Sequence, residues 1–162
     1  MSQPANRRID RIRSPGFVER LSELPLDEVR HRRDECLAER EYLSLLRRLV
    51  QGRAEILRAE VERLAEILAG EPQGPSRGEA VRISVPEEEM LLARRRVERL
   101  VADAGLSDPG ALDDESLAEA VDLLAKEERE VSEAREGAFV ALNAVQDELK
   151  RRYKDDPSLA LA

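Results

Sequence analysis

The sequence predicts an all-α fold: a long antiparallel coiled-coil helical hairpin with an additional shorter helix in the connection. Charged residues make up 38 % of the chain and aromatic residues 2 %, a composition typical of long helices and coiled coils. The stretches 26–69 and 113–154 contain no proline, the residue that most often ends a helix. In both stretches apolar residues recur at alternating spacings of three and four, which predicts a coiled-coil seam.

Residues 1–24 are expected to form a flexible basic arm with a short helix. Pro4, Pro15 and Gly16 interrupt this region, and chain ends of such composition are commonly loosely attached. Its arginines are expected to be solvated, the alternative being contact with an acidic surface of a partner protein. These arginines are Arg7, Arg8, Arg11 and Arg13.

The first long helix is expected over residues 25–70. Asp27 and Glu28 lie in its first turn, where acidic side chains interact favourably with the helix dipole, and Gly70 is a suitable stop. Such a helix is roughly 65 Å long. Its predicted seam consists of Leu43, Leu46, Val50, Ala54, Leu57, Val61, Leu64 and Leu68.

Residues 71–112 are expected to form a linker, rich at its start in glycine, proline and serine, that contains a short helix at about 86–103. The apolar face of this short helix needs a partner, either the hairpin itself or a second protein. A second long helix is expected over residues 113–154, capped at its start by Asp113 or Asp114. Residues 155–162 then form a tail.

Two positions of the seam predicted for the second long helix are charged. That seam consists of Val121, Leu124, Glu128, Val131, Arg135, Ala138, Leu142, Val145 and Leu149. A single polar residue in a seam commonly specifies register at some cost in stability. Glu128 and Arg135 together exceed that need, because a buried charge is strongly unfavourable unless it is paired. Either the helices separate here and admit water, or a ligand occupies the space between them.

Polar side chains form two matching rows near the middles of the long helices. The first row is Arg40, Ser44, Arg47, Gln51 and Glu55, and the second is Glu128, Ser132, Arg135, Phe139 and Asn143. Both rows advance by four, three, four and four residues, offsets that lie within about 80° of one helical face. In an antiparallel hairpin the rows face each other, which predicts a ligand site between the helices. Arginine forks, carboxylates and serine hydroxyls suit a guanine nucleotide, although the spacing alone does not identify it.

The sequence resembles the RsiG family, the actinobacterial anti-sigma factors that respond to cyclic di-GMP. The resemblance is clearest in LPLDEVRHRRDECLAEREYLSLLRRLVQGRAEILRAEV, residues 24–61, and in LAKEEREVSEAREG and ELKRRY of the last helix. The family's ligand motif is Glu-x3-Ser-x2-Arg-x3-Gln-x3-Asp, one copy on each of two antiparallel helices. The resemblance implies that these copies hold cyclic di-GMP, a dimer of it in the family. It also implies that the loaded protein sequesters a WhiG-type sigma factor, a relative of the flagellar class, and so represses sporulation genes.

The motif is incomplete in both rows. The first row keeps Ser44, Arg47 and Gln51, with Arg40 in place of Glu and Glu55 in place of Asp. The second row keeps Glu128, Ser132 and Arg135, with Phe139 in place of Gln and Asn143 in place of Asp. These departures imply ligand binding that is weakened, asymmetric or altered in stoichiometry, because Arg40 reverses a charge and Phe139 cannot form a hydrogen bond. Phe139 can instead stack against a base.

Three other functions compete with that of a nucleotide-responsive regulator. The same fold can act as a ligand-independent sigma-binding coiled coil, or as a generic coiled-coil scaffold, although a scaffold has no need of charges in its seam. An enzyme is not expected, because the only histidine, His31, lies among arginines and no phosphate-binding glycine loop is present. No metal is expected, since Cys36 has no second thiol with which to form a zinc site.

The composition also sets expectations about partners and location. A net charge of −8 argues against direct DNA binding and against an anionic membrane surface. No apolar run approaches the roughly 20 residues needed to span a bilayer. The polar start of the sequence and a single cysteine favour a cytoplasmic protein. Two motif rows in one chain remove the need for an obligate homodimer.

Overall fold

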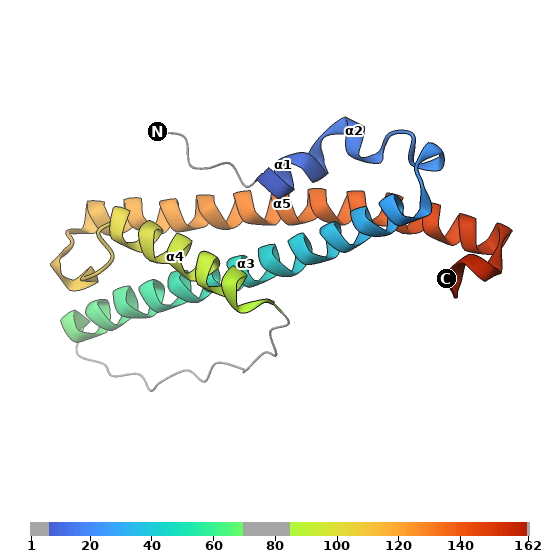
Figure 1. Cartoon of the computed structure of the whole chain (residues 1–162). Helices are drawn as coiled ribbons and strands as arrows, with labels where there is room; N and C mark the ends of the chain where they lie inside the picture. The colour runs from blue at the N-terminus through green and yellow to red at the C-terminus, as the bar shows by residue number, and fades with distance from the viewer. Residues whose placement is uncertain (1–6, 70–84, 162) are drawn as a thin grey trace. The chain divides into compact units, whose positions relative to one another are not determined.

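The computed structural model describes residues 7–69 and 85–161, and every regular element within them is a helix. Two of these helices are much longer than the rest, α3 and α5 (Figure 1). The all-helical class and the two long helices predicted from the sequence are therefore confirmed. In chain order the elements are α1 (Arg7–Arg13), α2 (Pro15–Val18), η1 (Leu21–Glu23), α3 (Leu26–Ala69), α4 (Glu87–Asp103), η2 (Pro109–Ala111), α5 (Asp114–Asp155) and η3 (Pro157–Ala160).

Local sequence explains where the helices begin and end. α5 is capped by Asp113, whose Oδ1 accepts a hydrogen bond from the backbone N–H of Ser116 at 2.8 Å. This hydrogen bonding lowers the pKa of the Asp113 carboxyl. α4 ends at Asp103 and is followed, after Ala104, by Gly105, whose φ of +68° lies in the left-handed region that glycine adopts without strain. The N–H of Leu106 then reaches back to the carbonyl of Val101 at 2.9 Å and satisfies one of the last helical acceptors.

The chain divides into two compact units. The first unit comprises Met1–Leu43 and Ser132–Ala162, and the second comprises Ser44–Val131. α3 and α5 each contribute one part to either unit, whereas α1 and α2 belong to the first and α4 to the second.

The core of the first unit includes residues that the sequence analysis assigned to a flexible arm. Ile9, Ile12, Phe17 and Leu21 are all buried, with Ile12 only 2 % exposed. They join buried side chains of α3 and α5, namely Val29, Cys36, Leu43, Ala138, Ala141, Leu142, Val145 and Leu149. The assignment of residues 7–24 to a flexible arm is thus wrong, because burial of four apolar side chains ties this segment to its unit. Residues 1–6 lie outside the described part of the chain.

Arginine side chains fasten the segments of the first unit together. Arg8 forms an ion pair with Glu39, and Arg11 forms one with Glu35. From α5, Arg152 donates hydrogen bonds to the carbonyls of Leu21 and Leu24, each at 2.7 Å. The arginines of α1 that were expected to be solvated therefore include two that pair with acidic residues of α3.

The second unit packs α3, α4 and α5 around a small apolar core. Contacts between α3 and α5 run in opposite order along the two helices: Gln51 bonds to Glu128, while Val61 lines one hollow with Leu117 and Val121. These helix segments are therefore antiparallel within this unit. The buried residues of this core are Ala54, Leu57, Leu106, Ala120 and Leu124. The predicted seam residues Leu64 and Leu68 lie outside the described side chains.

Candidate functional site

Three residues of the predicted ligand rows meet in the second unit. The amide Nε2 of Gln51 on α3 donates a hydrogen bond to Oε1 of Glu128 on α5 at 2.6 Å. Nη2 of Arg47 lies 3.9 Å from the same oxygen. We call Arg47, Gln51 and Glu128 the polar cluster.

Helix geometry places the polar cluster beside the core. Arg47 and Gln51 are four residues apart and so project from one face of α3. The adjacent Leu46 and Val50 are both fully buried, which orients that face. The side chains of Arg47 and Glu128 remain 41 % and 28 % exposed, so water reaches both charges and reduces their desolvation cost. A carboxylate at this seam position is tolerated because it is hydrogen-bonded and only partly buried.

The other residues of the first row are divided between the two units. Ser44 is half-buried and Glu55 is exposed, both in the second unit. Gly52 follows Gln51, and a Cβ atom added at Gly52 would meet no other atom within 4 Å. Arg40 belongs to the first unit, where its Nη2 pairs with Glu41 at 3.1 Å.

The remaining residues of the second row belong to the first unit. Ser132 is half-buried, whereas Arg135, Phe139 and Asn143 are exposed. Arg135, which the sequence analysis assigned to the seam, is exposed to solvent. The buried residues Val131 and Ala138 are seven apart, and Ala134, which is half-buried, fills the intervening seam position instead.

Sequence reasoning missed one buried charge. Glu39 is fully buried and paired with Arg8, and it continues the buried stripe of α3 at spacings of three and four from Cys36 to Leu43. Extending the predicted seam one heptad toward the N-terminus would have located it. Burial raises the pKa of the neighbouring Cys36 thiol to about 11, and the Glu39 carboxylate adds to this shift. Both groups belong to the packing of the first unit.

A comparison with protein-family models finds the RsiG-like family over residues 15–98, which is more than half of the chain. The chain belongs to the RsiG-like family. The matched region contains α2, α3 and the first part of α4, and therefore includes Ser44, Arg47 and Gln51. No curated protein sequence matches the chain.

Membership in the RsiG-like family indicates the class of function. The family is regulatory rather than enzymatic and indicates an anti-sigma role, with a sigma factor as the partner. Within the described part of this RsiG-like chain, no three histidine, cysteine, aspartate or glutamate side chains gather as a metal site would require. No helix among the described residues has both the length and the apolar character needed to span a bilayer.

Proposed function

We propose that this RsiG-like protein is an anti-sigma factor that binds cyclic di-GMP through α3 and α5. In the loaded state it would sequester a WhiG or flagellar-type sigma factor and repress its developmental genes. The observation that supports this most directly is the polar cluster, in which a donor amide, a guanidinium and a carboxylate from two helices converge. The chemistry of guanine matches all three groups.

The cluster offers guanine a complete set of partners. An arginine fork pairs with O6 and N7 of guanine, while a carboxylate such as Glu128 accepts from its ring and amino N–H groups. In the structure the cluster residues bond to one another instead. Ligand binding would exchange the Gln51–Glu128 hydrogen bond for bonds to the base, so the net gain must come from added contacts to phosphate and base faces. Ser44 lies one turn before the cluster on α3 and can donate to phosphate.

We further propose that α3 and α5 form a single antiparallel coiled-coil hairpin. The support is the pattern of burial along each helix. Buried residues of α3 follow spacings of three and four from Cys36 through Leu57, and those of α5 do so from Leu124 through Leu149 with few gaps. α4 lies in the connection between them.

The departures from the motif predict unequal contributions from the two rows. Phe139 is 44 % exposed and can offer a ring face but no hydrogen bond. Asn143 keeps an acceptor without the negative charge. We therefore expect the first row, together with Glu128 and Ser132, to supply most of the affinity. Arg135, an exposed residue of α5, is expected to contact a phosphate.

Isothermal titration of the full chain with cyclic di-GMP tests this function, with and without a WhiG-type sigma factor. A ligand that favours the complex must bind the complex better than the free protein, so the sigma factor should raise ligand affinity by the same factor as the ligand raises sigma affinity. Equal sigma affinity in the presence and absence of bound ligand would refute the gating. A lack of ligand binding in both cases would refute the sensor.

A second candidate function is a sigma-binding clamp that needs no ligand. The self-satisfied polar cluster favours it, since Glu128 already has its hydrogen bond without a nucleotide. Tight sigma binding that cyclic di-GMP does not change would establish the clamp. A generic scaffold is distinguished by replacing Glu128→Leu and Arg135→Leu together, because a scaffold would keep its function.

A further inference from the structure

α4 presents two apolar faces, and only one of them is covered. Ala93 and Val97 are buried at 0 % and 3 % exposure, and Leu100 and Val101 pack against the core of the second unit. On the other side Leu91 and Leu92 are 45 % and 55 % exposed. The sequence left open whether this helix packs against the rest of the chain or against a partner. In the structure α4 packs within the second unit, and Leu91 and Leu92 take no part in that packing. Leu91 and Leu92 are adjacent, large and exposed. Contiguous exposed apolar surface often marks an interaction site, whereas single exposed apolar residues are ordinary.

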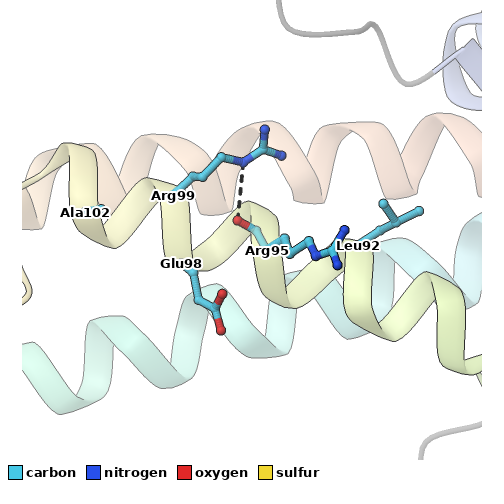
Figure 2. Close-up of a pocket in the computed structure, with 5 residues that line it drawn as sticks. All are labelled: Leu92, Arg95, Glu98, Arg99 and Ala102. Atoms are coloured by element: carbon cyan, nitrogen blue, oxygen red, sulfur yellow. Dashed lines mark hydrogen bonds between the residues drawn. The ribbon is translucent and has the colours of Figure 1, made fainter.

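A hollow of about 520 Å³ accompanies the exposed leucines. Its described lining comes entirely from α4: Leu92, Arg95, Glu98, Arg99 and Ala102 (Figure 2). Within it, Nε of Arg99 donates to the backbone carbonyl of Arg95 at 3.3 Å, as the dashed line shows. This bond uses one of the five N–H donors of the Arg99 guanidinium.

The same face is basic although the chain as a whole carries a net charge of −8. Between positions 94 and 99 stand four arginines and one glutamate. Arg96 is committed to the second unit, since it bonds Glu127 of α5 at 2.9 Å and 2.5 Å. Arg94 and Arg95 are exposed and, among the described residues, form no ion pair.

We propose that Leu91, Leu92, Arg95 and Arg99, the α4 outer face, form the docking surface for an acidic amphipathic helix of the sigma factor. This inference rests on the proposed anti-sigma function. Leucines of the α4 outer face would pack against the apolar side of that helix, while the arginines pair with its carboxylates. The family match reaches residue 98 and so includes three of these four residues.

A second copy of the chain fits the α4 outer face less well. In a two-fold symmetric contact the same surface meets itself, so two surfaces that each carry Arg95, Arg99 and a single carboxylate, Glu98, would face each other with an excess of positive charge. Like charges across an interface oppose association. The charge of the α4 outer face therefore favours a different, acidic partner.

The test measures binding of the full-length chain to a WhiG-type sigma factor by biolayer interferometry, with and without cyclic di-GMP. Arg95→Glu with Arg99→Glu should weaken the complex at least tenfold, and Leu91→Ser with Leu92→Ser should do so without a change of charge. The matched control is Arg53→Glu with Arg58→Glu, an equal charge change at exposed positions of α3. Circular dichroism verifies that each variant is folded.

The outcomes separate this inference from the proposed function. Unchanged sigma affinity of both α4 variants, or equal weakening of the α3 control, would overturn the docking surface while leaving the anti-sigma function intact. Altered self-association in sedimentation, with sigma binding unchanged, would assign the surface to a second copy and also overturn it. If the unsubstituted chain binds no sigma factor, both proposals fail. Cyclic di-GMP affinity of the α4 variants in the absence of sigma factor should stay within twofold.

Discussion

Several arginines of the first unit differ in their surroundings from two arginines of the second unit. In the first unit Arg8, Arg11 and Arg152 pair with acidic side chains or backbone carbonyls of the same unit. In the second unit Arg47 forms a long ion pair with Glu128, 3.9 Å between Nη2 and Oε1, and its side chain is 41 % exposed. Arg95 is exposed on α4. Arginines thus link separate segments within the first unit, whereas in the second unit Arg47 and Arg95 stay accessible to solvent and Arg96 pairs with Glu127.

This difference separates structural from binding roles more clearly than the sequence does. A guanidinium whose donors are taken up by internal acceptors stabilises its own fold. One that stays half-exposed beside an adaptable acceptor can exchange partners at modest cost. Four substitutions test whether the distinction holds.

Arg8→Met should have the largest effect on stability. Removal of Arg8 takes a charged partner from Glu39, which is fully buried, and loss of one member of a buried pair costs about 3 kcal/mol. Urea denaturation at pH 7 measures the change. Arg20→Met is the control, because the Arg20 side chain is 76 % exposed and its loss should change the free energy of unfolding little. Similar values for the two variants would mean that Arg8 does not fasten the first unit.

Arg47→Ala should affect binding rather than folding. We expect cyclic di-GMP affinity to fall roughly 30-fold, or about 2 kcal/mol, the range for loss of an arginine fork on guanine. The free energy of unfolding should change by less than about 0.5 kcal/mol, as for other partly exposed surface positions. Arg53→Ala serves as the control on the exposed side of α3, and calorimetry gives both affinities. A large loss of stability in Arg47→Ala would place this arginine with those of the first unit.

Glu148→Gln should destabilise the first unit by about 1 kcal/mol at pH 7, a value reduced for solvent screening. Hydrogen bonds from Arg151, and then from Arg152, lower the pKa of the Glu148 carboxyl from 4.5 to about 2. A carboxyl whose pKa is lowered by folding contributes stability above its unfolded value, and this contribution is lost as the pH falls from about 4.5 to about 2. Thermal unfolding of both proteins across that range should therefore converge at low pH. A difference that persists unchanged at pH 2 would contradict the assigned cause.

Gly52→Ala should produce the smallest change and, unlike the three substitutions above, should stabilise the chain. A Cβ at Gly52 meets open space, and alanine is favoured over glycine inside a helix by about 0.7 kcal/mol. Gly137 of the first unit is the contrasting position, because a Cβ there would meet the Arg13 side chain at 3.1 Å. Gly137→Ala should gain less, since Arg13 must shift to make room. Melting temperatures compare the two, and an equal gain would show that Arg13 yields freely.

The sequence was sufficient for the helices because their cause is local. Long proline-free stretches with apolar spacings of three and four determine α3 and α5 before any tertiary contact is known. The packing of residues 7–24 was missed because Pro15 and Gly16 interrupt its apolar residues, so no periodicity connects Ile12 with Phe17. Ile12 and Phe17 come to lie in one core only when the segment folds against the rest of the first unit.

The candidate site was predictable to the level of the polar cluster. Helical spacing brings Arg47 and Gln51 onto one face, and the antiparallel order within the second unit places Glu128 opposite them. Arg135 shows the limit of this reasoning. Between Val131 and Ala138 a seam can pass through position 134 or position 135 with equally good spacing. In the structure Ala134, the smaller side chain, is half-buried and Arg135 is exposed.

Burial of Cys36 gives the first unit a built-in reporter of its opening. With a pKa of about 11, only about one thiol in ten thousand is ionised at pH 7, and that one is shielded from reagents. Modification by a thiol-specific reagent must then wait until the packing around Cys36 opens. The labelling rate of the native chain, without any added probe residue, therefore measures how often this unit opens.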